Sequence, residues 1–376
     1  MSGTFVNYER LVKVADWLAE KEIDRIAGSY VSDATPGFSM LLARDGEVLF
    51  RRSYGMVDIE NGVRIRPSDH FIIASNTKQF TCLSILILRE RGLLDLDEPI
   101  ARFFPDFPEY KDEVTLRMLM THTSGIMEYF EDDLKKNLPI LRTAHTADII
   151  DLAKAYGNRL HFTPDTDQSY CNTAYVMLGS IIEQLSGMGF GQFLKKEIFD
   201  TLEMDQSIAP DYMDQPDPEQ VCGYMSAEGE NADLLGNDNH ARFIKIPYDM
   251  LEIGYADGNI STNVDDILKW HQYLYDKNDD RIVPYEIRRE LWEPHVLKTG
   301  RKTNYGLGIM TGDFCEGHLT VSERRELWHT GGSEGFISRI SYFPDEKISA
   351  VMLTNWNGIA RDELFKDMMD VFFKYV

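Results

Sequence analysis

A serine and a lysine three positions apart, Ser75 and Lys78, have the types and spacing of a nucleophile with its base. Serine is a weak nucleophile at its free pKa and needs a neighbouring group to accept its proton. Residues three apart lie on one face of a helix, and residues 80–88 are apolar almost all round, which indicates a buried helix. Because burial disfavours a charged amine, Lys78 at the start of that helix could serve as the base.

The same two residues also fit a plainer interpretation, a serine that caps a helix and is followed by an exposed lysine. An S-x-x-K pair is expected about once by chance in a chain of this length, and this chain contains one. The spacing alone therefore leaves both interpretations open.

Two polar tripeptides follow this pair along the chain, Tyr170-Cys171-Asn172 and His329-Thr330-Gly331. In this order, after Ser75-Asn76-Thr77-Lys78, they resemble the triple signature of the penicillin-recognising serine hydrolases. That family comprises class C β-lactamases, D-alanyl-D-alanine carboxypeptidases, D-aminopeptidases and related esterases. The resemblance extends from about Pro36 to Asn355. Connecting segments that share it are Leu119-Met120-Thr121-His122-Thr123-Ser124-Gly125, Tyr305-Gly306-Leu307-Gly308, and Gly258-Asn259-Ile260-Ser261-Thr262 before Asp265-Asp266.

The resemblance implies a helix-borne serine that attacks a carbonyl group and forms an acyl-enzyme, which water or another acceptor then releases. Carried over to this chain, Ser75 is the nucleophile, and Lys78 and Tyr170 form the proton relay. The Asn172 side chain would hydrogen-bond the substrate amide. The strand that lies along the substrate would be lined by His329, Thr330 and Gly331. The backbone N–H groups of Ser75 and Gly332 would form the oxyanion hole, in which loss of one donor costs about 3 kcal/mol of transition-state stabilisation.

Two other tripeptides compete for the place of the second motif, Tyr156-Gly157-Asn158 and Ser261-Thr262-Asn263. We prefer Tyr170 because Phe162-Thr163-Pro164 precedes it and a strong helical pattern, Thr173–Leu185, follows it. In the family a glycine usually follows that proline, and Asp165 in its place leaves the geometry of the turn open.

The third motif also has a competitor, since Lys298-Thr299-Gly300 has the form found in β-lactamases. The run after it, residues 301–304, is polar and has no strand character, whereas His329-Thr330-Gly331 stands just ahead of a good strand. Lys298 is therefore predicted to be a solvated loop lysine.

Gly331-Gly332-Ser333-Glu334-Gly335 also fits G-x-S-x-G, the nucleophile elbow of α/β-hydrolases. That elbow needs a hydrophobic strand before the serine and a helix after it. Here a charged run, residues 324–326, comes before it and an alternating strand pattern, residues 336–342, follows, so Ser333 is predicted to be a turn residue. His122, flanked by hydroxyl residues, is predicted to organise its loop by hydrogen bonds rather than to act as a base.

The two chain ends supply the strands that would position these motifs. Gly37–Arg44 and Glu47–Tyr54 read as strands joined at Asp45-Gly46, a strong hairpin signal because both turn positions take positive φ. Further strand patterns are Gly335–Phe343 and Ile348–Thr354, and helical patterns occupy residues 6–26, about 94–295 and 360–375. These patterns predict an α/β (α+β) fold, with an antiparallel sheet flanked by the terminal helices. The predicted domains are residues 1–93 with 300–376, which form the sheet, and residues 94–299, mainly helical, with the active site between them.

The composition sets the remaining expectations. Lysine and arginine total 39 against 62 aspartates and glutamates, and the net charge of −23 argues against nucleic-acid and membrane-surface partners. The four cysteines form no C-x-x-C pair, and no metal-ligand spacing is present, so we predict free thiols, no metal and no cofactor. The first residues contain no apolar segment of the signal-peptide kind, which predicts a cytoplasmic protein. The oligomeric state cannot be read from these patterns.

We predict a serine hydrolase that forms an acyl-enzyme on Ser75 and cleaves a small amide, D-amino-acid peptide or ester. His329, where β-lactamases have a lysine, would carry only a partial positive charge near pH 7 for a substrate carboxylate. We therefore predict weak or absent β-lactam turnover. The two alternatives are a class C-like β-lactamase and a catalytically silent protein that uses the site only to bind.

Overall fold

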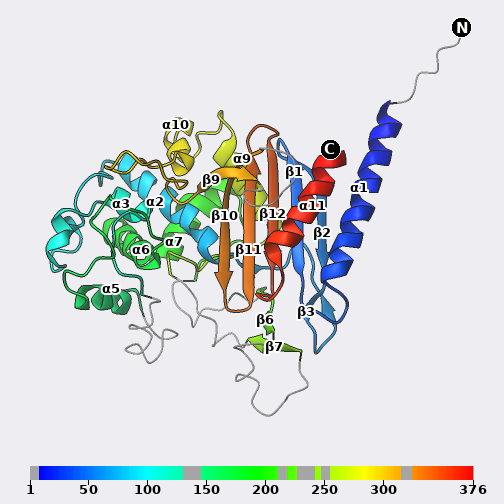
Figure 1. Cartoon of the computed structure of the whole chain (residues 1–376), viewed down its shortest axis with the longest axis horizontal. Helices are drawn as coiled ribbons and strands as arrows, with labels where there is room; N and C mark the ends of the chain where they lie inside the picture. The colour runs from blue at the N-terminus through cyan, green and yellow to red at the C-terminus, as the bar shows by residue number, and fades with distance from the viewer. Residues whose placement is uncertain are drawn as a thin grey trace, which may run out of the picture.

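A six-stranded antiparallel sheet lies at the centre of the computed structural model (Figure 1). The structure describes residues 8–129, 145–210, 217, 219–226, 242–246, 255–314 and 324–375, with side chains from residue 18 onward. The strands, in the spatial order β2-β1-β12-β11-β10-β9, are β1 (Phe38–Arg44), β2 (Glu47–Tyr54), β9 (Met310–Phe314), β10 (Arg324–Ser333), β11 (Phe336–Phe343) and β12 (Ile348–Thr354). Because β1 pairs with β12, placing Leu41 opposite Val351, the two chain ends share one sheet, as the sequence predicts.

The turn between β1 and β2 has the predicted geometry. Asp45 and Gly46 have φ angles of 51° and 82°, the positive values that an Asp-Gly pair tolerates in a two-residue hairpin. The hairpin between β10 and β11 turns at Glu334-Gly335, where Gly335 has a φ of 75°. The β10–β11 pairing is continuous from this turn, whereas the β1–β2 pairing has a bulge between Leu42 and Ala43.

The structure extends the sheet beyond the sequence prediction at β10. The local sequence pattern predicted a strand only from Gly335 onward, and the family resemblance implied one at His329–Gly331; the structure has a strand over all of residues 324–333, with β9 as an edge strand beside it. Glu326 of β10 is buried, and its carboxylate pairs with Arg339 of β11 at 3.0 Å. This cross-strand ion pair allows a charged segment to enter the sheet, which a local hydrophobicity pattern cannot reveal.

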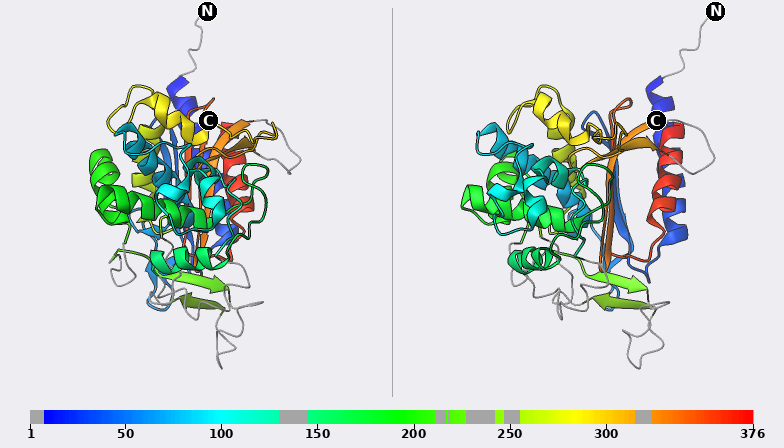
Figure 2. Two further views of the ribbon diagram at one scale, coloured as in Figure 1. Left: turned by 90° about the vertical axis from the view of Figure 1, so that its left-hand side faces the viewer. Right: turned by 60° about the vertical axis from the view of Figure 1, so that its left-hand side comes forward.

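Helices cover both faces of the sheet (Figure 2). On one face α1 (Tyr8–Tyr30) and α11 (Arg361–Tyr375) lie side by side. The remaining α-helices are α2 (Thr77–Glu90), α3 (Leu116–Met120), α5 (Thr146–Ala155), α6 (Asn172–Ser186), α7 (Phe190–Leu194), α8 (Asp200–Leu202), α9 (Val264–Tyr275) and α10 (Tyr285–Arg288). Four 3-10 turns are described, η1 (Ala74–Asn76), η2 (Ile100–Arg102), η3 (Glu109–Asp112) and η8 (Arg289–Trp292), and a π-helical turn, η5 (Lys195–Phe199), joins α7 to α8. Most of these elements lie on the opposite face of the sheet from α1 and α11 (Figure 2).

Three short strand pairs complete the described structure. Their members are β3 (Met56–Asp58) with β4 (Val63–Arg64), β5 (Phe71–Ile72) with β8 (Ser261–Thr262), and β6 (Gly223–Ser226) with β7 (Phe243–Ile246). The β5–β8 pair matters for function, because it ties the segment just before Ser75 to the segment just before α9.

Two apolar cores form because side chains alternate across each buried strand. Met40 and Leu42 of β1 point toward α1 and α11, where they pack with residues such as Met368. Leu41 of the same strand points the other way, into a larger core shared with the helical layer. This larger core continues from the sheet to the helices, so the predicted division into two domains stays a prediction.

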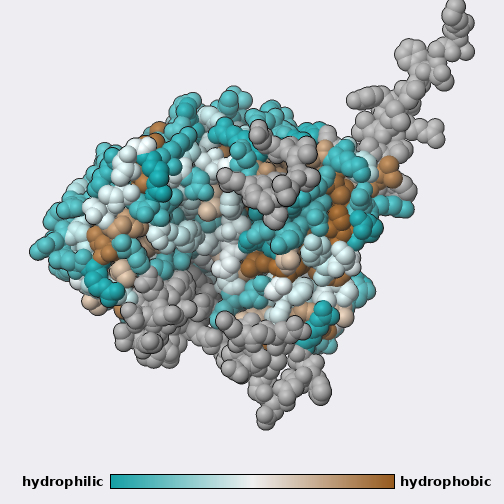
Figure 3. Space-filling view, viewed as in Figure 1, coloured by the Kyte–Doolittle hydropathy of each residue, from teal (hydrophilic) through white to brown (hydrophobic). Residues whose placement is uncertain are grey.

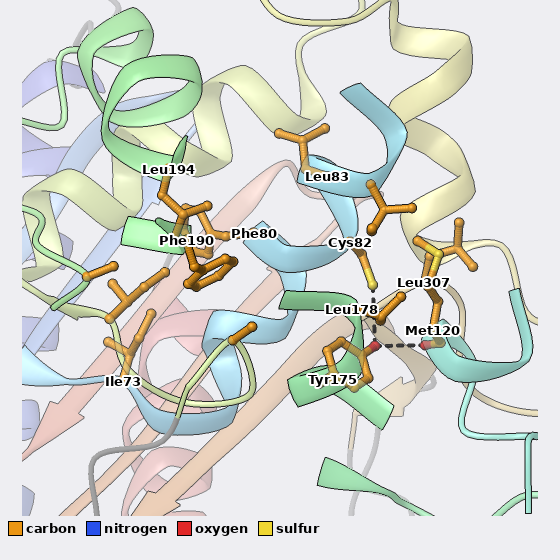
Figure 4. Packing of buried hydrophobic residues seen from close by; sticks show 14 of the residues in the cluster. Ile73, Phe80, Cys82, Leu83, Met120, Tyr175, Leu178, Phe190, Leu194 and Leu307 are labelled. Atoms are coloured by element: carbon orange, nitrogen blue, oxygen red, sulfur yellow. Dashed lines mark hydrogen bonds between the residues drawn. The ribbon is translucent and has the colours of Figure 1, made fainter. Parts of the chain in front are cut away.

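The helix that begins at Thr77 is buried on all sides, as its sequence indicates. Figure 4 shows Phe80 of α2 beside Phe190 and Leu194 of α7. On the opposite side, the Tyr175 hydroxyl of α6 donates to the Met120 carbonyl at 2.7 Å and lies 3.3 Å from the Cys82 sulfur. These contacts hold α2, and therefore Lys78 near its start, in a rigid setting.

The described surface is that of an acidic, folded protein. The face seen in Figure 3 is mainly hydrophilic, with small scattered apolar patches. Among the described residues, none of the helices combines the length and apolar character needed to cross a bilayer. Two polar stretches of the sequence, residues 211–218 and 228–240, lie outside the described residues except for Asp217.

Candidate active site

Ser75 is the one partly exposed residue in an otherwise buried segment. Every other residue from Asp69 to Leu88 is buried. The serine lies in η1, at the start of α2, and Ala74 before it has a φ of 47°, which is rare for a residue with a side chain. Such backbone strain is typical of functional sites, where the surrounding structure holds it in place. Solvent therefore reaches this segment only at Ser75, the residue that carries the candidate hydroxyl.

Lys78 lies beneath that hydroxyl with no exposure to solvent. Its Nζ atom is 3.0 Å from the Ser75 Oγ, 2.7 Å from the Asn172 Oδ1 and 2.8 Å from the Asp257 carbonyl oxygen. As a cation the amine donates to all three oxygens. As a neutral amine it donates to the two fixed acceptors, Asn172 and Asp257, and can accept the Ser75 proton. The geometry thus places a possible proton acceptor on the serine.

Tyr170 brings a third ionisable group to the same point. The Lys78 Nζ lies 4.8 Å from the centre of its ring, and the tyrosine side chain is 39% exposed. Burial of the hydroxyl raises the pKa of Tyr170 above its usual value, while the Lys78 charge and hydrogen bonds with Lys78 and Ser75 act in the opposite direction. The phenol, the amine and the serine hydroxyl therefore form one interacting cluster.

The loop that carries Tyr170 is held by His122. The His122 Nδ1 accepts a hydrogen bond from the Cys171 N–H at 3.0 Å, its carbonyl accepts from the Ser169 N–H at 3.0 Å, and its ring packs on Tyr170 at 4.3 Å. The ring is buried, and burial followed by the Lys78 charge lowers its pKa well below the usual value. His122 is thus a neutral organiser of this loop.

Asp165 takes the backbone conformation that a glycine would normally occupy. Its φ is 61°, and its carboxylate accepts from the His295 Nε2 at 2.7 Å and from the Lys298 N–H at 3.0 Å. Aspartate tolerates the left-handed region better than most residues. These two contacts explain how the turn forms without the usual glycine.

Two further polar residues near Lys78, Asp257 and Glu128, were not singled out from the sequence. Asp257 is buried, and its carboxylate accepts from the Tyr129 hydroxyl at 2.9 Å and from the Tyr255 N–H at 2.8 Å. Glu128 accepts from the Asn172 N–H at the start of α6. A signal for Asp257 exists in the sequence, since it directly precedes the segment Gly258-Asn259-Ile260-Ser261-Thr262 that we noted for its resemblance.

The strand β10 brings the third motif beside η1. A Cβ atom added to Gly331 would lie 2.0 Å from the Ile73 carbonyl oxygen and 2.4 Å from the Ser338 Oγ. The Ser338 hydroxyl itself donates to the Ile73 carbonyl at 2.8 Å. Only a glycine allows the strand to approach the nucleophile segment this closely. Thr330 is half-buried and Gly332 is exposed, so a substrate can reach both.

The Gly332 N–H is expected to point toward Ser75. Strand β10 pairs with β9 only through Trp328, so among the described residues no strand covers that edge of β10 beyond this point. On the other edge, Ser333 and Phe336 flank the two-residue turn and should form the closing hydrogen-bonded pair. Because the backbone groups of an antiparallel strand alternate in direction, the Gly332 N–H then faces the uncovered edge. This is the orientation that an oxyanion-hole donor needs.

His329 differs from what we expected of it. Its ring is buried, with Nδ1 2.6 Å from the Thr330 carbonyl and Nε2 2.9 Å from the Tyr305 hydroxyl. The ring therefore donates from Nδ1 and accepts from Tyr305 at Nε2. Burial, followed by the Lys78 charge, lowers the pKa of His329 to about 3. The prediction of a partial positive charge near pH 7 is wrong, because the ring has no solvent to stabilise the cation.

Exchange of Gly331 for alanine is predicted to destabilise the protein. The added methyl group would overlap the Ile73 carbonyl, and such overpacking costs about 1–3 kcal/mol of unfolding free energy. Gly332→Ala is the matched control, since its nearest neighbour would be the Ile337 Cγ2 at 3.9 Å. Thermal or chemical unfolding of both variants tests this, and equal stabilities would contradict the proposed close approach of β10 to η1.

Buried neutral histidines should make the protein sensitive to acid. His271 of α9 is buried, and burial lowers its pKa to about 3. Because the folded pKa lies below the unfolded one, the unfolded chain binds the extra proton between about pH 6.5 and 3, and stability falls as the pH falls through this window. As the pH is lowered through this window, the unfolding free energy of His271→Gln should therefore fall less steeply than that of wild type. The difference in slope should be up to about 1.4 kcal/mol per pH unit. Denaturant unfolding at pH 6.5, 5.5 and 4.5 measures this difference, and parallel curves would refute it.

Residues of the competing motifs make structural contacts away from Ser75. Asn263 caps α9 by accepting from the N–H groups of Asp265 and Asp266. Asn158 accepts from the Glu109 N–H, and Lys298 is an exposed residue in a turn. Ser333 ends one strand and faces another across the hairpin, so the strand-to-helix context of a nucleophile elbow is absent there.

Among the described residues, no cluster of three or more His, Cys, Asp or Glu side chains could hold a metal ion. The Cys82, Cys171 and Cys222 side chains are free thiols. Burial raises the pKa of Cys82 to about 12, so this thiol stays protonated near neutral pH. The reactive groups that the described structure brings together are the Ser75 hydroxyl, the Lys78 amine and the Tyr170 phenol.

Comparison with known proteins identifies the family to which this chain belongs. A family model described as Beta-lactamase matches residues 20–369. The chain belongs to this family, and it is a serine hydrolase related to the β-lactamases and penicillin-binding proteins.

Several characterised proteins are similar to it. The chain is 28% identical over 325 residues to penicillin-binding protein 4* of Bacillus subtilis (strain 168), covering 84% of this chain and 67% of that protein. It is 26% identical over 341 residues to the D-aminopeptidase of Brucella anthropi, covering 89% of this chain and 58% of that enzyme's length. The chain therefore spans less than two thirds of the D-aminopeptidase.

Solved structures share the fold. The D-amino acid amidase from Ochrobactrum anthropi SV3 superposes with a TM-score of 0.77 at 22% identity, covering 95% of this chain and 99% of that chain. An octameric penicillin-binding protein homologue from Pyrococcus abyssi superposes with a TM-score of 0.75 at 24% identity, covering 95% of this chain and 77% of that chain. At these identities the matches show a common architecture.

Proposed function

We propose that this protein hydrolyses a small amide, D-amino-acid peptide or ester through an acyl-enzyme formed on Ser75. The observation that carries the proposal is the 3.0 Å contact between the Lys78 Nζ and the Ser75 Oγ, at the one partly exposed point of a buried segment. A general base within hydrogen-bonding distance is the first requirement for activating a serine.

In the proposed first step, the Lys78 amine, once it has given up its own proton, accepts the Ser75 proton as Oγ attacks the substrate carbonyl. Asn172 and the Asp257 carbonyl keep the amine aligned through hydrogen bonds at 2.7 and 2.8 Å. The negative charge that develops on the carbonyl oxygen is stabilised by the N–H groups of Ser75 and Gly332. Tyr170, in contact with both Lys78 and Ser75, passes the proton to the leaving group as the bond between that group and the carbonyl carbon breaks. Water then attacks the carbonyl carbon of the acyl-enzyme ester and gives a proton to the Lys78–Tyr170 pair. The bond from that carbon to the Ser75 Oγ breaks, the Oγ takes the proton back, and the acid is released.

The proposed substrates are short and neutral or cationic. A net charge of −23 attracts a protonated amine and repels an anion. A D-aminopeptidase among the relatives and a D-amino acid amidase among the similar structures support D-amino-acid amides and peptides as the first compounds to test. We also propose, from the sequence alone, that the protein acts in the cytoplasm and without a nucleic-acid or membrane partner.

A class C-like β-lactamase is the second candidate function. The buried, neutral His329 argues against it, because a β-lactam carboxylate would find no cation at this position of the strand. We therefore retain the prediction of weak or absent β-lactam turnover. The third candidate, a silent binding protein, is disfavoured by the intact cluster of Ser75, Lys78 and Tyr170.

A hydrolysis panel tests the proposed function. It compares p-nitrophenyl esters, D- and L-amino-acid amides, D-alanyl-D-alanine peptides and the chromogenic cephalosporin nitrocefin. We expect turnover of an ester or a D-amino-acid amide and little turnover of nitrocefin. Efficient nitrocefin hydrolysis would favour the β-lactamase. If neither turnover nor labelling of Ser75 by a fluorophosphonate occurs, the binding protein would be favoured.

A further inference from the structure

An arginine on the far layer of the molecule contacts the backbone of the strand beside Ser75. Arg361, the first residue of α11, donates from Nη1 to the Gly331 carbonyl at 3.3 Å and to the Ser338 carbonyl at 3.2 Å. We propose that Arg361 is a positioning residue, which aligns and polarises the Gly331–Gly332 peptide group and so strengthens the Gly332 N–H as an oxyanion donor. This inference rests on the proposed function, in which that N–H binds the oxyanion.

One peptide group links Arg361 to the reaction centre. The Gly331 carbonyl and the Gly332 N–H belong to the same planar trans unit, in which they point in opposite directions. Gly331 is paired with Ser338, and Arg361 contacts the carbonyls of both, so the Gly331 carbonyl faces β11. The N–H at the other end of the unit then faces the edge of β10 that no described strand covers, and β10 closely approaches the Ile73 carbonyl just before η1.

The guanidinium group is held in a fixed orientation for this contact. Its Nε and Nη2 atoms donate to the two carboxylate oxygens of Asp362 at 3.0 and 2.8 Å. Asp362 in turn accepts from Arg339 of β11 at 3.0 Å. Because the guanidinium is planar, this two-point contact directs the remaining nitrogen, Nη1, at the carbonyls. The Arg361 side chain is only 16% exposed, so solvent screens its charge little.

The charge of Arg361 acts on the neighbouring part of the strand. The low pKa of His329 arises first from burial and then from Lys78, and Arg361 contributes in the same direction. A cation that affects a side chain two residues before Gly331 also acts on the Gly331 carbonyl, which it contacts directly.

Polarisation of this peptide favours the transition state over the bound substrate. Donation to a carbonyl withdraws electron density from the peptide and makes its N–H a stronger donor, as in other hydrogen-bond chains. The oxygen that this N–H meets is neutral in the substrate and negatively charged in the tetrahedral intermediate. Removing Arg361 should therefore lower kcat more than it raises KM.

Arg361→Gln, with Lys366→Gln as control, tests the proposal. Lys366 lies on the same helix and pairs with Asp370 at 2.6 Å, so its replacement also removes one positive charge and one ion pair from α11. The measurements are kcat and KM for a p-nitrophenyl ester and Ki for phenylboronic acid, which forms a tetrahedral anionic adduct with a serine hydroxyl. For Arg361→Gln we expect kcat to fall about tenfold and the boronate Ki to rise about tenfold, with KM within about twofold of wild type. Lys366→Gln should leave all three values unchanged.

Arg361→Lys separates charge from a purely structural role. It keeps a cation near the Gly331 carbonyl and should recover most of the lost kcat and boronate affinity. If Arg361→Gln fails to fold, the same measurements on Arg361→Lys still test the proposal. An unchanged boronate Ki in folded Arg361→Gln would overturn the inference. The inference would also be overturned if Arg361→Gln and Arg361→Lys lost kcat to the same extent and also lost melting temperature to the same extent. If wild type neither hydrolyses esters nor binds the boronate, the proposed function fails, and the inference fails with it.

Discussion

Replacing Ser75 with alanine should lower kcat/KM for ester and amide hydrolysis by about 10⁴- to 10⁶-fold, the size of loss seen when a serine nucleophile is removed. Ser75 is the partly exposed hydroxyl that faces Lys78, and alanine has no atom to form the acyl bond. Initial rates with a p-nitrophenyl ester measure the loss. Mass spectrometry after fluorophosphonate treatment should show a single adduct on wild type and none on Ser75→Ala.

The matched control is Ser333→Ala, which removes the serine of the competing G-x-S-x-G motif. Ser333 lies at the end of β10 in a strand-turn-strand hairpin, so its replacement should leave hydrolysis within about twofold of wild type. If Ser333→Ala loses the activity and Ser75→Ala keeps it, the assignment of the nucleophile is wrong.

Replacing Lys78 with methionine should lower kcat/KM by about 10²- to 10⁴-fold, the usual contribution of a positioned general base. Methionine is also long and flexible, so it can fill the buried space, but it cannot accept the Ser75 proton. It also leaves the Asn172 and Asp257 oxygens without their donor, which should cost about 1–3 kcal/mol of stability. Rates should therefore be measured well below the melting temperature of the variant.

Lys298→Met is the control for the Lys78 prediction, because it removes the lysine of the Lys298-Thr299-Gly300 alternative. Lys298 is exposed on a turn, and its backbone N–H, which the substitution keeps, donates to Asp165, so the variant should stay fully active. Loss of activity on replacing Lys298 alone would instead make that tripeptide part of the site. Retention of activity by Lys78→Met would exclude Lys78 as the base.

Much of the architecture could be predicted because its signals are local. The Asp45-Gly46 hairpin follows from two residues that accept positive φ, and the strands at both chain ends follow from alternation of apolar side chains. The buried helix after Ser75 follows from its apolar run. The charged start of β10 could not be predicted in this way, since the partner that makes Glu326 tolerable, Arg339, is supplied by another strand.

The sequence by itself determined the residue types and the order of the motifs, and hence which hydroxyl, amine and phenol were available for chemistry. The tertiary structure alone decided what surrounds them. The Lys78 Nζ donates to the backbone carbonyl of Asp257, which is 179 positions away in the chain. Arg361 contacts the Gly331 carbonyl from a helix on the far face of the sheet. The charge state of His329 was also decided there, because burial is a property of the packed fold and has no signature in neighbouring residues. Local patterns encode the backbone path, whereas solvation and long-range contacts exist only once the chain has folded.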